Sequence, residues 1–303
     1  MADGKPVDNV YYGTASWTDK TLLDSKRFYP PDVDTPAERL RFYAEHFPLV
    51  EVDSTYYALP SERNAALWIE RTPPHFVFDI KAFALLTHHP AAGRGLPAKL
   101  REQLPADKKN YYRKDLPPEA LATVQDMFVS ALRPLESAGR LGAVLFQFPH
   151  WFVPSRDNRD YLRELADSFP YRIAVEFRGG GWMKDDQSAE RTLSLLEELG
   201  LTYVVVDEPQ GFKTSVPPVT AATSRDLAMI RFHGHNADTW EKRGITAAER
   251  FRYLYAEEEL EKWVDPAREL AAMSKQLHVL MNNCYQDYGV RNAAQFAGLL
   301  ERD

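Results

Sequence analysis

The sequence predicts a (β/α)8 barrel, the TIM-barrel fold, forming a single domain over residues 1–303. Eight short apolar segments rich in β-branched residues alternate with amphipathic stretches, which is the pattern of parallel strands joined by helices. The length also fits, because such barrels take about 250 residues plus insertions. No linker rich in proline or glycine divides the chain. An open doubly wound sheet is the alternative.

The predicted strands follow one another at regular intervals. In chain order they are VYYGTAS from Val10, LVEVDST from Leu49, HFVFDIKA from His75, LGAVLFQFP from Leu141, YRIAVEFR from Tyr171, LTYVVVDEP from Leu201, LAMIRFHG from Leu227 and QLHVLMNN from Gln276. Most are too apolar for half-exposed strands, so we expect both faces of the sheet to be covered.

Helix signals fill the segments between these strands. Thr35-Pro36-Ala37-Glu38 combines an N-cap threonine, a proline at the first helical position and a capping-box glutamate. A helix from Ser188 is predicted to stop at Gly200. Helical spacing also occurs in PPEALATVQDMFVSALRPLESAG, RDNRDYLRELADSF and the final VRNAAQFAGLLERD. We therefore expect a helix after each strand.

Two connections, after the third and seventh predicted strands, are too long for simple crossovers. Insertions that follow a strand lie at the C-terminal mouth of a barrel, where active sites form. The first insertion, residues 88–115, holds seven basic residues against three acidic ones, with Tyr111 and Tyr112 among them. This composition suits single-stranded nucleic acid or another anionic ligand. A solvated loop is the alternative.

Composition excludes several classes of protein. The 44% hydrophobic and 27% charged residues are typical of a folded domain. A net charge of -7 excludes a nucleic-acid footprint over the whole surface. The one cysteine, Cys284, can form neither an internal disulfide nor a thiolate zinc site. No apolar run is long enough to span a membrane and Met1 to Val10 lack a signal-peptide pattern, so we expect a cytoplasmic protein without a membrane partner.

Polar residues mark the C-terminal ends of most predicted strands. Pairs two residues apart share a face of a strand; they are Glu51 and Asp53, Asp79 and Lys81, Glu176 and Arg178, and Arg231 and His233. Three more strands end in Gln147, in Asp207, and in Asn282 with Asn283. Isolated buried charges are costly, so this convergence predicts an active site. An ion-pair network that caps the barrel is the alternative.

Three chemistries fit these residues. A divalent metal, the one cofactor that we consider, could be held by Glu51, Glu176, Asp207 and His233. Without a metal, Glu176, Asp207 and His233 could act as acids and bases. Lys81 could instead form a Schiff base. We therefore predict Glu176, Asp207, His233 and Lys81 as catalytic residues.

The same strand ends and the loops after them offer groups for binding a substrate. Arginine makes bidentate contacts to phosphate, so Arg178 and Arg231 predict a small anionic, phosphorylated substrate. Aromatic residues could stack on a base or sugar, or pack in the core; they are Trp17, Tyr56, Tyr57, Trp151, Trp182 and Trp240. The predicted substrate-binding residues are Arg178, Arg231, Trp17, Glu51, Asp53, Tyr56, Gln147, Trp182, Asn282 and Asn283.

At these residues the sequence resembles the YecE-like family, domain of unknown function 72. The matching motifs are GTASW from Gly13, FYP from Phe28, VEVDSTYYALP from Val50, Lys81 with Thr87-His88, QFP from Gln147, VEFR from Val175 with Trp182, VDEP from Val206, RFHGHN from Arg231 and NNCY from Asn282. The resemblance implies a TIM-barrel-like fold and supplies no reaction. Barrels of this family have been likened to metal-dependent phosphodiesterases that repair DNA.

Three functions remain open from the sequence. The first is an enzyme acting on a phosphate-containing substrate, with phosphoester hydrolysis ranked first and a metal optional. The second is a non-catalytic module that binds single-stranded nucleic acid or a partner through residues 88–115. The third is a metal-free isomerase or lyase acting on a sugar phosphate.

Overall fold

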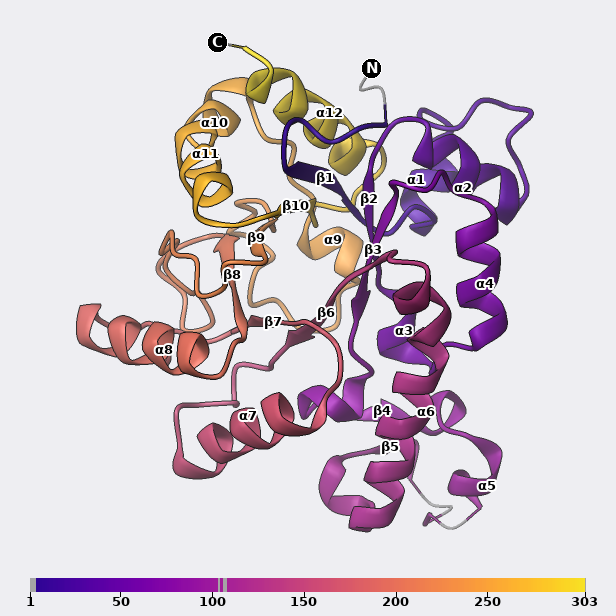
Figure 1. Cartoon of the computed structure of the whole chain (residues 1–303), viewed down its shortest axis with the longest axis vertical. Coiled ribbons are helices and arrows are strands. Elements are labelled where there is room, and N and C mark those ends of the chain that lie inside the picture. Colours follow the sequence, from indigo (N-terminus) through magenta and orange to yellow (C-terminus); the bar gives the residue numbers. More distant parts are fainter. Residues whose placement is uncertain (1–3, 103, 106–107, 303) are drawn as a thin grey trace.

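The computed structural model describes residues 4–102, 104–105 and 108–302, and its centre is a closed barrel of eight parallel strands (Figure 1). Around the barrel the strands follow the order β1-β10-β9-β8-β7-β6-β3-β2. They are β1 Val10–Ala15, β2 Leu49–Val52, β3 Val77–Lys81, β6 Leu141–Gln147, β7 Ile173–Glu176, β8 Thr202–Asp207, β9 Ala228–Phe232 and β10 Leu277–Met281. All eight predicted strands are thus confirmed, and the open sheet is excluded because β1 and β2, the first and last strands of this order, pair with each other.

Helices surround the barrel on the outside (Figure 1). The longer ones are α2 Pro36–Ala44, α4 Glu62–Glu70, α6 Pro118–Ser137, α7 Arg156–Ser168, α8 Asp186–Glu198, α11 Val264–Met273 and α12 Tyr288–Leu300. Short helices are α1 Lys20–Ser25, α3 Ser54–Tyr57, α5 Ala98–Arg101, α9 Ala247–Arg250 and α10 Glu257–Glu261, with 3-10 turns at Ala84–Thr87, Gly93–Gly95 and Arg113–Asp115. No helix of the described residues is long and apolar enough to cross a membrane.

The expectation of a helix after every strand is wrong for β8. The chain between β8 and β9, residues 208–227, forms no helix. Proline cannot donate the backbone hydrogen bond that a helix needs, and this segment contains Pro209, Pro217 and Pro218 as well as Gly211. The segment therefore crosses the outside of the barrel as an irregular loop.

Local signals set several helix ends as predicted. At the start of α2, Thr35 Oγ1 accepts from the Glu38 amide at 3.2 Å, and the Glu38 carboxylate accepts from the Thr35 amide at 2.9 Å. Helix α8 begins before Ser188, because Asp185 caps it by accepting from the Ser188 amide at 2.8 Å. After α8, Gly200 takes the left-handed conformation with φ of +66°.

The first insertion, after β3, packs onto the side of the barrel beside α6 (Figure 1). It contains the two-stranded sheet β4 Ala91–Ala92 and β5 Asn110–Tyr111. Tyr111 is buried, Lys108 pairs with Asp115 at 2.7 Å, and the Arg113 guanidinium lies 4.7 Å from the Tyr161 ring. Residues 103, 106 and 107 of this insertion lie outside the described residues. Much of its predicted basic, aromatic character is thus used within the fold.

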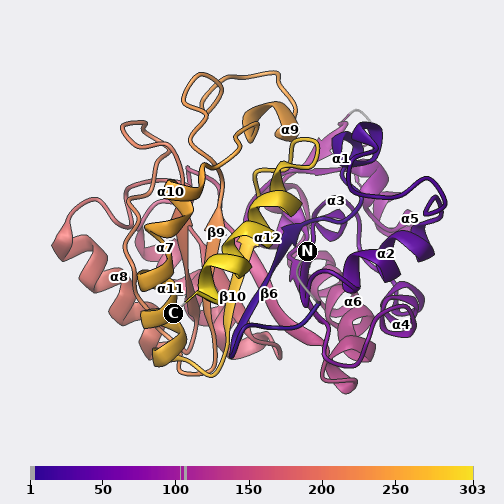
Figure 2. The same ribbon diagram turned by 90° about the horizontal axis from the view of Figure 1, so that it is seen from above.

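The second insertion, after β9, stands above the barrel at the C-terminal ends of the strands, where α9 lies (Figure 2). Arg250 of α9 organises it by donating to the carbonyls of Thr239, Trp240 and Lys242. The carbonyl oxygens of a loop without regular structure need such donors. This insertion therefore forms an ordered wall beside the mouth.

Candidate active site

A network of buried ion pairs fills the barrel just below its mouth. Arg231 on β9 donates from Nε and Nη2 to the two oxygens of Glu51 on β2, at 2.9 and 2.7 Å. Its Nη1 donates to Glu176 Oε2 on β7. All three side chains are fully buried. The guanidinium fork matches carboxylate geometry, so the network ties three strands together across the barrel.

His233 lies beside this network as a neutral imidazole. Its Nε2 is 3.0 Å from Glu176 Oε1, and Asn282 Nδ2 donates to its Nδ1 at 2.8 Å. Because Nδ1 accepts, the ring proton sits on Nε2 and points to Glu176. Burial lowers the pKa of His233 to about 4, more than the Glu176 carboxylate raises it. Gln147 Nε2 also donates to Glu176 Oε1, at 2.6 Å.

One guanidinium can balance only one of the two carboxylates that face it. Burial opposes the ionisation of Glu176, but Arg231 and then His233 hold its pKa well below the usual range. Burial raises the pKa of Glu51 to about 8, against the opposing attraction of Arg231. Glu176 therefore carries the negative charge. The ion-pair alternative considered from the sequence describes these residues well.

These residues do not fit a divalent metal. The oxygens of Glu51 and Glu176 already accept hydrogen bonds from Arg231, Gln147 and His233, and His233 Nδ1 accepts from Asn282. Among the residues described, no group of three or more His, Cys, Asp or Glu side chains is arranged to hold an ion. Asp207, the fourth candidate ligand, points elsewhere.

Asp207 and its neighbour Glu208 point to opposite sides of the barrel wall. Val206 is in register with the inward Arg231, so alternation turns Asp207 outward and Glu208 inward. Asp207 Oδ2 accepts from the Tyr255 hydroxyl at 2.7 Å and lies 2.9 Å from His235 Nε2. Asp207 is therefore not part of the mouth, which corrects its assignment as a catalytic residue or metal ligand.

Glu208 takes the place predicted for Asp207 and was not identified from the sequence. Its Oε2 accepts from Arg178 Nη1 at 3.0 Å, and its Oε1 accepts from the Val216 amide at 2.7 Å. The side chain is buried, and burial raises its pKa to about 7, against the attraction of Arg178. A carboxyl group that titrates near neutral pH can both give and take a proton.

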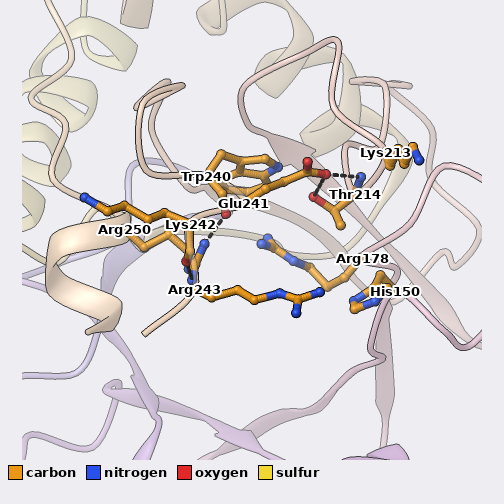
Figure 3. Close-up of a pocket in the computed structure, with 9 residues that line it drawn as sticks. All are labelled: His150, Arg178, Lys213, Thr214, Trp240, Glu241, Lys242, Arg243 and Arg250. Atoms are coloured by element: carbon orange, nitrogen blue, oxygen red, sulfur yellow. Dashed lines mark hydrogen bonds between the residues drawn. The ribbon is translucent and has the colours of Figure 1, made fainter. Parts of the chain in front are cut away.

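Arg178 connects Glu208 to a basic pocket at the mouth (Figure 3). The cavity measures about 450 Å³ and is lined by His150, Arg178, Lys213, Thr214, Trp240, Glu241, Lys242, Arg243 and Arg250. The lining includes five cationic side chains and one carboxylate. That carboxylate, Glu241, already accepts from the amide and hydroxyl of Thr214 at 3.2 and 3.1 Å.

The floor and the rim of this basic pocket differ. The Arg178 guanidinium lies 4.5 Å from the Trp240 ring, and Trp240 is buried with its indole N–H unpartnered. Lys213, Lys242 and Arg243 stand exposed around the opening. Arg178 is thus fixed by Glu208 and Trp240, whereas the rim cations are free to close on a ligand.

Lys81 and Asp53 lie at the other side of the mouth. Lys81 Nζ is 3.2 Å from Asp53 Oδ1 and 5.5 Å from the centre of the Tyr56 ring. The structure thus brings Lys81, Asp53 and Tyr56 together at one side of the mouth.

Three predicted binding residues are occupied in packing. Trp182 is buried, stacks 4.6 Å from Phe177, and donates its indole N–H to the Phe152 carbonyl. Trp17 is buried edge-on against Trp68. Asn283 is buried and donates to the Tyr253 carbonyl and to Asn292 Oδ1, both at 2.8 Å. We do not assign these three side chains to the site.

A second buried polar pair lies deeper in the barrel. Asp79 accepts from the Ala143 amide at 2.9 Å, and its Oδ2 is 2.9 Å from Nδ1 of His278 on β10. A Cβ on Gly142 would come within 2.4 Å of Asp79 Oδ1, so glycine makes room for this pair. Asp79 is thus engaged inside the barrel rather than at the mouth.

Comparison with known proteins establishes the family. The sequence profile described as "Protein of unknown function DUF72" matches residues 11–303. The chain belongs to the DUF72 family. The UPF0759 protein YunF of Bacillus subtilis is 33% identical over 299 residues, covering 96% of this chain and 95% of that protein. YecE of Escherichia coli strain K12 is 26% identical over 200 residues, 65% of this chain and 59% of that protein.

Solved structures of the DUF72 family share the fold. A family protein from Thermotoga maritima is 33% identical, covers 97% of this chain and 99% of its own, and superposes with a TM-score of 0.75. One from Enterococcus faecalis is 24% identical with a TM-score of 0.77, covering 97% and 96% of the two chains. The predicted resemblance is confirmed. The names of these relatives state no activity.

Proposed function

We propose that this chain is an enzyme that binds a small phosphate-containing substrate in the basic pocket and acts on it by metal-independent proton transfer. The observation that carries the proposal is the pocket itself, with five cationic side chains against one carboxylate that is already hydrogen-bonded. Its place at the C-terminal mouth of the barrel is where barrel enzymes hold their substrates.

Phosphate is the anion that this pocket suits best. A phosphate monoester carries close to two negative charges and several acceptor oxygens, so it satisfies several cations at once. Arg178 offers a fixed guanidinium at the floor, and Arg243 offers a second fork at the rim. Lys213 and Lys242 add point charges that raise the local concentration of an anionic substrate.

Glu208 is the acid or base that we assign to the reaction. Its carboxylate accepts a hydrogen bond from Arg178. A bound phosphate competes for that guanidinium and releases the carboxyl group to exchange a proton with the substrate. Its pKa of about 7 suits a group that must accept and return a proton at neutral pH.

This chemistry favours isomerisation of a sugar phosphate, or elimination of water from it, over hydrolysis of a phosphoester, and both of these reactions keep the phosphate ester. Hydrolysis is commonly driven by a metal that activates water and stabilises the developing charge. The carboxylates of Glu51 and Glu176 are engaged by Arg231, and Asp207 faces away from the mouth. Proton transfer needs no such ion.

Phosphorus NMR of the purified protein with a panel of sugar phosphates tests the proposal. We expect a new signal that is still a phosphate ester, formed equally with and without EDTA. The double variant Lys242→Ala/Arg243→Ala should lose turnover, whereas Arg163→Ala, which removes an exposed arginine on α7, should retain it. Inorganic phosphate as the product would restore hydrolysis to first rank. No turnover of any member would contradict the proposal.

A further inference from the structure

We infer that the ligand of the basic pocket is a nucleotide, whose base stacks on a row of aromatic rings beside the pocket. This inference rests on the proposed phosphate pocket and on Glu208 as its acid or base. The ribose of a nucleoside has no free carbonyl, so a nucleotide substrate replaces the sugar-phosphate isomerisation by another proton transfer. The row runs through Tyr57, Tyr56, His89, Trp151 and His150, with neighbouring ring centres 5.0, 5.4, 5.7 and 4.9 Å apart. Tyr56 and Tyr57 come from α3, which follows β2, and the other three come from the loops that follow β3 and β6.

The row and the pocket share a residue. His150 lines the basic pocket next to Arg178 (Figure 3). It also contacts the Trp151 ring. Near its other end Lys81, which is paired with Asp53, lies over the Tyr56 ring. His89, in the middle of the row, is a neutral imidazole between Lys81 and Arg178, and its burial together with these two cations lowers its pKa to about 3. The aromatic row therefore spans the mouth between the two cationic ends.

Trp151 is the ring best placed to receive a base. Half of its surface, 49%, is exposed, and Tyr57 is 67% exposed. Large aromatic side chains are usually well covered in folded proteins. The two histidines pack against Trp151 in T-shaped contacts, at interplanar angles of 82° and 68°, and hold the indole in place while half of it stays exposed. A flat aromatic ligand could cover the exposed part of the indole.

A phosphate pocket alone does not distinguish a nucleotide from a sugar phosphate, but the aromatic row does. Stacking of one base on an aromatic side chain increases affinity by roughly 5- to 150-fold. Stacking tolerates any base because every base presents a flat face. A nucleoside 5′-phosphate matches this arrangement, because its phosphate can bind the cations of the basic pocket while its base stacks on the row of rings.

Calorimetric titration with adenosine 5′-monophosphate and ribose 5-phosphate tests the inference, since the two ligands differ by the base. The wild type should bind the nucleotide at least roughly 5-fold more tightly. Trp151→Ala should remove that advantage and leave ribose 5-phosphate binding unchanged, and Trp151→Phe should retain most of it. The exposed position of Trp151 makes both variants compatible with folding.

The outcomes separate this inference from the proposed function. Equal affinity of the wild type for the two ligands would overturn the nucleotide inference and leave the phosphate pocket standing. An equal loss of both ligands in Trp151→Ala would overturn it too, because the indole would then not be reading the base. Failure of both ligands to bind the wild type would contradict the inference and the proposed function together.

Discussion

Replacing Arg231 by methionine should strongly destabilise the barrel. The side chain is fully buried and donates to both Glu51 and Glu176, so Arg231→Met leaves Glu51 without its ion pair and Glu176 with only the more distant Arg178, at 3.7 Å. Removing one partner of a buried ion pair costs about 3–5 kcal/mol. At roughly 2 °C per kcal/mol for a chain of this size, the melting temperature should fall by about 6–10 °C.

Thermal unfolding followed by circular dichroism measures this effect against a matched control. Arg163 on α7 also pairs with a carboxylate, Asp160 at 3.0 Å, but both side chains are about half exposed. Exposed pairs contribute less than about 1 kcal/mol, so Arg163→Ala should shift the melting temperature by no more than about 2 °C. Adding Glu51→Gln and Glu176→Gln to Arg231→Met should recover part of the loss. If Arg231→Met melts like the control, the network does not stabilise the barrel as argued.

Three further predictions concern the mouth, its outer wall and the strand packing. Sulfate affinity, measured by calorimetry, should fall as the pH rises through about 7, because ionised Glu208 competes for Arg178. Glu208→Gln should remove this dependence on pH. If the variant shows the same pH profile as the wild type, Glu208 does not compete for Arg178. The hydrogen bond with Asp207 raises the pKa of His235, so the imidazolium stabilises the fold below about pH 6.5 and this contribution is lost as the pH rises through the raised value. Urea unfolding of His235→Gln should therefore show a deficit of under about 1 kcal/mol at pH 6 that disappears at pH 9; a deficit independent of pH would show that the charge is not involved. A Cβ on Gly13 would lie 1.9 Å from a backbone carbonyl of β2, so Gly13→Ala should lower the free energy of unfolding in urea by at least about 1–3 kcal/mol. Gly298 in α12 has open space around it, so Gly298→Ala should be neutral or slightly stabilising. Equal effects of the two substitutions would contradict this packing.

The strands could be predicted from the sequence because a buried parallel sheet needs continuous apolar segments of limited length. The capping box at Thr35 was equally predictable from the sequence, since its two hydrogen bonds join residues only three positions apart. The prediction of a helix after β8 was wrong because it extended the regular alternation of strands and helices over a segment that contains three prolines. Pattern thus predicted the elements, and local chemistry decided the exception.

The candidate site was predictable only where a strand fixes the direction of a side chain. Glu51, Glu176, Arg231 and His233 converge because all four project inward from strand ends. At the end of β8 the predicted inward-facing residue was wrong by one position, because Glu208 faces inward and Asp207 faces outward. The register of a strand against its neighbours sets that phase, and a single sequence does not show it.

The loops set the remaining limits of prediction. Lys213, Lys242, Arg243 and Arg250 come together from segments without periodicity, so no spacing in the sequence predicts that they share one pocket. The indoles of Trp151 and Trp182 follow strands in similar contexts, yet one is half exposed and the other stacks in the core. Only the packing around each ring decides whether the indole is exposed or buried.

The most direct test of the central claim is to locate a phosphate-like anion in the protein. Crystals soaked in tungstate, an electron-dense mimic of phosphate, reveal the anion by its anomalous scattering. We predict a peak in the basic pocket within about 3 Å of the guanidinium groups of Arg178 and Arg243, with the rim lysines turned toward it. Tungstate bound only elsewhere, with this pocket empty at saturating concentration, would contradict the assignment of the pocket as the substrate site.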